Sequence, residues 1–175
     1  MSLYIFDKDK TLLRAVRSRW FFKRSPLKPE EQTLRKGVFE KLAELRQGGH
    51  QIAIATNQIA VAHGIITLDE AEELVRNCAD KVGGVSAWRL CPCDPKAKIW
   101  LNDRENPFAR DDPNRKPHPG MILEIMDELG VSPWDTFMIG DKKVDRQSAK
   151  AADVTFIDEK KFFKSRKKRK QSPGR

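Results

Sequence analysis

The chain has 175 residues, which is enough for one domain with a buried core and too few for two comfortable ones. No apolar run approaches the ~20 residues that a membrane-spanning helix needs, which argues against an integral membrane protein of that kind. The three cysteines, an odd number, argue against a disulfide framework, and the first ten residues do not resemble a signal peptide. These features predict a cytoplasmic protein.

The net charge of +9 is concentrated in one segment. Residues 160–175 hold nine Lys or Arg residues and no acid, which leaves 25 basic against 25 acidic residues elsewhere. We therefore predict a neutral domain over residues 1–158 and a basic, disordered tail over 159–175. Such a tail could bind nucleic acid or simply aid solubility, and its composition leaves both open.

Short β-branched or aromatic runs alternate with segments of helical period along the body of the chain. Strands are predicted at 3–7, 51–57, 86–92, 137–141 and 154–158. Helices are predicted at 29–49, 67–84, 120–130 and 142–152. The second helix should begin with a capping box of Thr67 and Glu70, and Cys78 should face the core. This alternation predicts an α/β fold, with a mostly parallel sheet and helices on both faces.

Three of the predicted strands end in polar side chains. In a parallel sheet these ends share one edge, and ligands bind beyond it. Carboxylates gathered there would repel one another without a cation, and oxygen ligands without histidine favour Mg²⁺. Lys116, in a loop leading into a helix, adds positive charge, so the set suits phosphoryl transfer. The strand-end residues are Asp7 with Asp9 two positions later, Thr56 and Asn57, and Asp141.

Four short stretches carry a family resemblance: "FDKDKTL", "IATNQ", "RKPHPGM" and "MIGDKKVD". Their order and spacing resemble the four motifs of haloacid dehalogenase-like (HAD) phosphatases, over about residues 3 to 158. Together with "CPCDP", they look most like the branch of D-glycero-D-manno-heptose 1,7-bisphosphate phosphatases and histidinol-phosphate phosphatases. The resemblance implies a single Rossmann-like HAD core without a large cap domain, and a phosphomonoester hydrolase that requires Mg²⁺.

The resemblance also implies a role for each residue. Asp7 would be the nucleophile that forms an aspartyl-phosphate, and Asp9 would be the general acid and then the base. Mg²⁺ would be held by Asp7, by the backbone carbonyl of Asp9 and by Asp141, with Asp145 as an alternative ligand. The phosphoryl oxygens and the rest of an anionic substrate would contact Thr56, Asn57, Arg115 and Lys116. Lys10 stands where these phosphatases usually have glycine.

The same branch often carries a structural zinc held by a Cys-x-His pair and a later Cys-x-Cys pair. Here the first pair is Cys91 and Cys93, whereas Asp112 and Asn114 stand where the later cysteines would be. Asparagine is a poor ligand in a closed tetrahedral zinc site, so no structural zinc is expected.

The substrate is left open between two classes. The branch resemblance favours a small phosphorylated metabolite, such as a sugar phosphate or histidinol phosphate. A nucleic-acid 3′-phosphate is the alternative, because "FIDEKKFF" is similar to the end of polynucleotide 3′-phosphatases and the tail is basic. Residues 14–30, which include Trp20 and Phe21, could clamp a ligand or pack on the core. A non-catalytic binding module is a further reading, and we expect a monomer.

Overall fold

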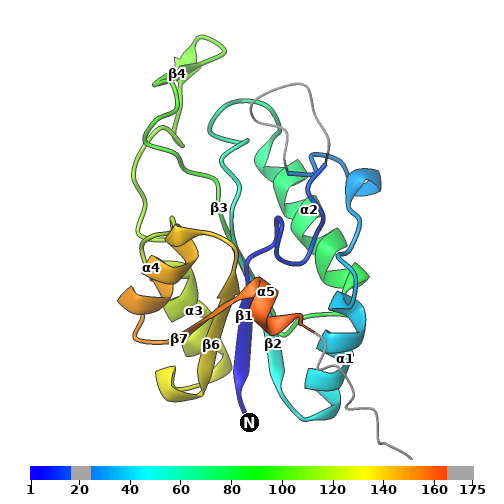
Figure 1. The fold of residues 1–175 in the computed structure, drawn as a ribbon. Helices are drawn as coiled ribbons and strands as arrows, with labels where there is room; N and C mark the ends of the chain where they lie inside the picture. Colours follow the sequence, from blue (N-terminus) through cyan, green and yellow to red (C-terminus); the bar gives the residue numbers. More distant parts are fainter. Residues whose placement is uncertain (17–24, 165–175) are drawn as a thin grey trace, which may run out of the picture.

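A computed structural model describes residues 1–16 and 25–164. Its centre is a parallel five-stranded sheet with the strand order β3-β2-β1-β6-β7 (Figure 1). All four strand pairings are parallel. The strands are β1 (Leu3–Phe6), β2 (Gln51–Asn57), β3 (Ala87–Cys91), β6 (Thr136–Gly140) and β7 (Thr155–Asp158). The predicted α/β class and the predicted strands are confirmed, with ends shifted by a residue or so.

Helices cover both faces of the sheet, as expected (Figure 1). On one face, α3 (Gly120–Leu129) and α4 (Lys143–Ala151) pack against Leu3, Ile5 and Met138. On the other, α1 (Val38–Gln47) and α2 (Leu68–Lys81) pack against Phe6, Ile54 and Ile139. Both faces of the central strands are buried because every crossover places a helix over the sheet.

The predicted capping box at the start of α2 is present, because Thr67 accepts a hydrogen bond from the Glu70 backbone N–H while the Glu70 side chain accepts one from Thr67. Cys78 is fully buried on the core side of this helix, as predicted. Among the residues that the structure describes, no helix combines the length and apolar character that a membrane span requires.

The helix predicted over 29–49 is wrong in its first half. A short 3-10 helix spans Pro29–Glu31, and α1 begins only at Val38. Leu34 instead forms a bridge with Leu13, which ties this segment to the loop after β1. Gly37, at φ +81°, precedes the helix in a left-handed conformation that interrupts the helical path. Tertiary pairing overrides the apolar spacing here.

Two further differences concern loops. A small hairpin of β4 (Trp100–Leu101) and β5 (Arg104–Glu105), where no strand was predicted, lies between β3 and α3 and projects from the body (Figure 1). The packed body also continues beyond residue 158. Helix α5 (Glu159–Phe162) follows β7 directly, and Phe162 and Phe163 pack on the core. The tail boundary therefore lies beyond Phe163; residues 165–175 and Trp20 with Phe21 are outside the described residues.

The chain order of the strands determines where a site can form. The chain runs from β1 outward through β2 and β3, then crosses to β6 and β7 on the other side of β1. The connection that follows β1 leads to β2 on one side, and the connection that follows β6 leads to β7 on the other. Because these two connections leave the sheet in opposite directions, a crevice opens between the carboxyl ends of β1 and β6. The residues after β1, β2 and β6 therefore meet at one place.

Candidate active site

The loop after β1 holds three consecutive buried charged residues. Asp7, Lys8 and Asp9 are 2%, 0% and 4% exposed. The Lys8 ammonium lies 3.0 Å from the nearer Asp9 carboxylate oxygen, Oδ1. Charged groups at this depth are costly unless each meets a partner, so the loop has to be organised around ion pairs.

Lys116 reaches the same place from the loop before α3. Its Nζ lies 2.7 Å from Asp7 Oδ1 and 2.7 Å from Asp145 Oδ1, and it donates a hydrogen bond to the Ala55 carbonyl at 2.8 Å. Lys116 is 1% exposed and Asp145 is fully buried. One buried cation thus joins the ends of β1 and β2 to the start of α4.

Asn57 holds the backbone of Lys116. Its Oδ1 accepts a hydrogen bond from the Lys116 N–H at 3.0 Å, and its Nδ2 donates to the Lys116 carbonyl at 2.9 Å. The phosphoryl contact expected of Asn57 stays a prediction, and the contacts observed here are to the Lys116 backbone. This pair fixes where the Lys116 side chain leaves the loop.

Thr56 and Asp9 are linked through Gln58, a residue not singled out from the sequence. Gln58 Nε2 donates to Thr56 Oγ1 at 2.8 Å and to Asp9 Oδ2 at 3.2 Å. Gln58 is 4% exposed. Gln58 stands in the quoted stretch "IATNQ" and Lys8 in "FDKDKTL", but neither was assigned a role from the sequence.

Asp7, Asp141 and Asp145 form the one cluster of metal-ligating side chains identified among the described residues. Their nearest ligand atoms lie within 4.8 Å of one another. Asp7 Oδ2 and Asp141 Oδ1 are buried and accept no hydrogen bond within the described chain. Clustered carboxylates with unpartnered oxygens fit a hard divalent cation such as Mg²⁺.

Gly140, the last residue of β6, allows Asp145 to lie under the strand end. A Cβ atom at Gly140 would meet Asp145 Oδ2 at 2.5 Å and Asp145 Cβ at 2.6 Å. Asp145 Oδ2 also accepts a hydrogen bond from the Lys142 N–H at 3.0 Å, which closes the first turn of α4. The glycine in "MIGDKKVD" is therefore required by a close approach.

The electrostatics of the cluster differ between its carboxylates. Burial would raise the pKa of Asp7, but the charges of Lys116 and Lys142 outweigh this effect and hold the pKa below its ordinary value. Burial likewise lowers the pKa of Lys116, but Asp7 and Asp145 outweigh it and keep that pKa above its ordinary value. The Asp7–Lys116 pair is therefore fully charged at neutral pH, as a carboxylate nucleophile requires.

Asp141 shows the opposite effect. Burial raises the pKa of Asp141, and the neighbouring carboxylates of Asp7 and Asp145 raise it further against the opposing charge of Lys142. The positive charge around Asp141 is too small to offset its burial and the two neighbouring carboxylates. A divalent cation would supply the missing charge.

Arg115 belongs to a network at the edge of this site. Its guanidinium lies 3.2 Å from Asp94 Oδ1 and donates to the Cys93 carbonyl at 3.1 Å. Asp94 Oδ2 in turn lies 2.9 Å from His63 Nε2. The substrate contact expected of Arg115 remains a prediction, with Asp94 orienting its side chain.

The two cysteines considered for zinc are both buried thiols. Cys93 Sγ lies 3.6 Å from Asp112 Oδ2, so the aspartate that replaces a cysteine does face this pair. Burial raises the pKa of Cys91 to about 12 and also raises that of Cys93. Because a bound metal would itself deprotonate these thiols, the expected absence of a structural zinc stays a prediction.

The chain is similar to proteins of known family. The model for haloacid dehalogenase-like hydrolases matches residues 108–158. The D-glycero-beta-D-manno-heptose-1,7-bisphosphate 7-phosphatases of Photorhabdus laumondii and Escherichia coli are each 32% identical over 122 residues, or 67% of this chain. The match covers 62% and 61% of those relatives, so the chain spans about three-fifths of their length.

Solved structures show the same fold. D,D-heptose 1,7-bisphosphate phosphatase from B. bronchiseptica, complexed with magnesium and phosphate, superposes with a TM-score of 0.70 at 25% identity, over 89% of this chain and 79% of that one. A HAD-like phosphatase structure from Mesorhizobium loti gives 0.72 at 24% identity, over 88% and 69%. With the parallel sheet and the four motifs on its edge, these matches show that the chain belongs to the haloacid dehalogenase-like hydrolases.

Proposed function

We propose that the chain is a Mg²⁺-dependent phosphomonoester hydrolase that acts through an aspartyl-phosphate on Asp7. The observation that carries this proposal is the buried Lys116, 2.7 Å from both Asp7 and Asp145, beside carboxylate oxygens that accept no hydrogen bond from any residue that the structure describes. An arrangement that brings a charged nucleophile, a fixed cation and a metal-fitting cluster together is suited to phosphoryl transfer.

The residues divide the reaction between them. Asp7 attacks phosphorus, and Lys116 holds a phosphoryl oxygen and neutralises the charge that grows in the transition state. Asp9 protonates the leaving alcohol and then takes a proton from the attacking water. Gln58 fixes the Asp9 carboxyl through the 3.2 Å contact to Oδ2. Mg²⁺, held by Asp7 and Asp141 with Asp145 beside them, would screen the phosphoryl charge.

The substrate class that we infer is a small phosphorylated metabolite, in particular a sugar phosphate. Relatives at 32% identity are named heptose bisphosphate phosphatases, which supports this class without fixing the sugar. We infer a cytoplasmic site of action from the three free thiols in the structure.

Phosphate release tests the proposal. The full chain is incubated with Mg²⁺ and a panel of sugar mono- and bisphosphates, histidinol phosphate, nucleotides and a 3′-phosphorylated oligonucleotide. We expect turnover of sugar phosphates, its loss on chelation and its return with added Mg²⁺. Activity that survives exhaustive chelation would contradict the metal role.

The Asp7→Asn variant tests the nucleophile. It keeps the size of the side chain and removes the attacking charge, so turnover should fall by at least about a thousandfold while the fold is retained by circular dichroism. Near-normal turnover in this variant would refute the assignment. If the wild-type chain released no phosphate from any substrate of the panel, a non-catalytic binding module would be favoured instead.

A further inference from the structure

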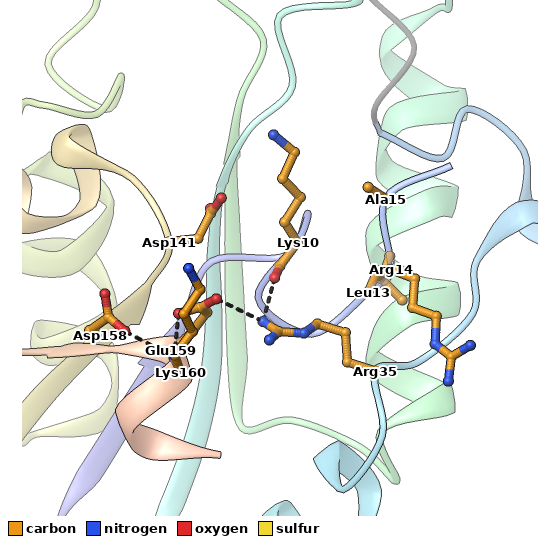
Figure 2. A pocket seen from close by; sticks show the side chains of 9 residues that line it. All are labelled: Lys10, Leu13, Arg14, Ala15, Arg35, Asp141, Asp158, Glu159 and Lys160. Atoms are coloured by element: carbon orange, nitrogen blue, oxygen red, sulfur yellow. Dashed lines mark hydrogen bonds and ion pairs between the residues drawn. The ribbon is translucent and has the colours of Figure 1, made fainter. Parts of the chain in front are cut away.

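A cavity of about 400 Å³ adjoins the candidate active site on the side of β7 (Figure 2). This volume suffices for a phosphate-bearing group. Its lining contains four basic side chains and three carboxylates, with Asp141 at the boundary with the metal-fitting cluster. The lining residues are Lys10, Leu13, Arg14, Ala15, Arg35, Asp141, Asp158, Glu159 and Lys160.

Three of the seven charged side chains that line this cavity have partners among the described residues, namely Arg35, Asp158 and Glu159. Arg35 lies 3.3 Å from Glu159 Oε1 and donates to the Lys10 carbonyl at 2.6 Å. Asp158 accepts a hydrogen bond from the Lys160 N–H at 3.0 Å and so closes the first turn of α5. Asp141 belongs to the cluster that fits a divalent cation.

The ammonium groups of Lys10 and Lys160 have no such partner. Within the described part of the chain, neither forms an ion pair with a carboxylate, whereas Lys116 forms two. In Figure 2 both lysine side chains lie toward the Asp141 side of the cavity, while the Arg14 guanidinium points away from it. Two cations thus line the cavity that Asp141 shares with the metal-fitting cluster.

The backbone of Lys10 provides a second, independent observation. Its φ is +71°, a conformation that glycine adopts readily and that a side chain with a Cβ adopts only with strain. Strain of this kind persists only where surrounding contacts hold the backbone, as Arg35 holds the Lys10 carbonyl, and it clusters at functional sites. A lysine side chain that reaches from a strained loop toward the reacting group fits an anion-binding role.

We propose that Lys10 and Lys160 form a subsite for a second phosphate, carried by the part of the substrate that departs with the leaving oxygen. The inference rests on the proposed hydrolase function, and it names the substrate feature, a second phosphate, by which the enzyme would select its substrate. The second phosphate could be a monoester, as in a small bisphosphate, or a diester, as between nucleotides. Both present the same anionic oxygens to two ammonium groups.

Matched substrate pairs separate these sources. One pair is a diol monophosphate and its bisphosphate, with three to six carbons between the oxygens. The other is thymidine 3′-phosphate and a dinucleotide with a 3′-phosphate. For each pair, kcat/KM with the second phosphate is divided by kcat/KM without it. We expect a ratio of about ten or more in wild type for one pair, since a factor of ten needs only one charge-assisted contact.

The variants then test the two lysines. Lys10→Gln and Lys160→Gln should each lower the ratio by about tenfold, while Lys161→Gln, which changes an exposed lysine of α5 outside the cavity lining, should leave it unchanged. Lys10→Gly should lower the ratio and raise the melting temperature, because it removes both the charge and the strain. A purely structural lysine would not change the ratio at all.

A binding measurement provides a readout without turnover. In the Asp7→Asn chain with Mg²⁺, calorimetry should give a tighter Kd for the bisphosphate than for the monophosphate, and Lys160→Gln should remove the difference. A wild-type ratio near one for both pairs, or a ratio that the lysine variants leave unchanged, overturns the subsite while hydrolysis stands. No hydrolysis of any substrate overturns the proposed function and, with it, this inference.

Discussion

Two ion-pair triads in this molecule have nearly the same geometry and lie in opposite surroundings. In the first, Lys116 lies 2.7 Å from Asp7 and 2.7 Å from Asp145, and the three side chains are at most 3% exposed. In the second, Arg89 on β3 lies 2.8 Å from Glu124 and 2.6 Å from Glu128 on α3, with side chains 32% to 45% exposed. Equal distances do not imply equal energies. The buried triad cannot lose one member without leaving charges unpaired, whereas water can replace any partner in the exposed one.

The largest effect is expected from removing the cation of the buried triad. Lys116→Met keeps the length of the side chain and leaves Asp7 and Asp145 as unpaired buried carboxylates. The free energy of unfolding should fall by about 3–5 kcal/mol, as measured by urea denaturation. Added Mg²⁺ should recover part of this loss, because a divalent cation can pair with the same carboxylates. A loss below 1 kcal/mol without metal would show that water reaches the triad.

A smaller effect should come from Gly140→Ala, which leaves all the charges and displaces Asp145. The added methyl group would lie 2.5–2.6 Å from three Asp145 atoms, so α4 or Asp145 has to shift. We expect a loss of about 1–3 kcal/mol in unfolding free energy, together with a weaker Mg²⁺ response in thermal melts. Gly48→Ala is the matched control, since its methyl group would meet only the His50 ring at 3.1 Å and a carbonyl at 3.4 Å.

Asn57→Ala tests whether the buried triad depends on its backbone support. The variant removes both hydrogen bonds to the Lys116 backbone and leaves the Lys116 side chain chemically unchanged. The free energy of unfolding should fall by about 1–2 kcal/mol. In phosphate release, kcat should fall by a larger factor than KM rises, because the Lys116 ammonium is no longer held in its position beside Asp7. Asn57→Asp retains the acceptor for the Lys116 N–H but sets a carboxylate oxygen against the Lys116 carbonyl, so it should lose at least as much stability as Asn57→Ala. If Asn57→Asp is clearly more stable than Asn57→Ala, the bond donated to that carbonyl contributes little.

The smallest effect is expected in the exposed triad. Arg89→Met should change the unfolding free energy by no more than about 0.5 kcal/mol and leave phosphate release unchanged, because Glu124 and Glu128 stay hydrated. Raising the salt concentration should reduce even this difference. A loss comparable to that of Lys116→Met would mean that distance, and not burial, decides the energy of these triads.

Much of the site could be predicted because its residues stand at the ends of recognisable strands. Asp7 and Asp141 follow apolar runs, and the parallel sheet brings those ends together. The roles of Gln58 and Lys8 could not be predicted in this way. Gln58 matters through contacts to two residues, Thr56 and Asp9, one of which lies 49 positions away. Lys8 matters because the fold buries it completely.

The difference between local sequence patterns and contacts across the fold also explains the two wrong boundaries, at the first helix and at the tail. Apolar spacing extended the first helix back to residue 29, but Leu34 pairs with Leu13 in the loop after β1. Charge counting began the tail at residue 159, but Phe162 and Phe163 pack on the core and carry the chain with them. Periodicity and charge are local properties of the sequence, and the boundaries that they predicted were shifted by contacts between distant segments of the fold.

The sequence by itself determined the alternation of strands and helices, the edge of the sheet that carries the site and the family, because each of these is written in short local patterns. Only the tertiary structure decided which charges meet. Lys116 and Asp7 are 109 residues apart and form a buried ion pair, and Asn57 binds the Lys116 backbone across 59 positions. The physical reason is that burial and partner choice depend on packing between distant segments, which no local pattern encodes.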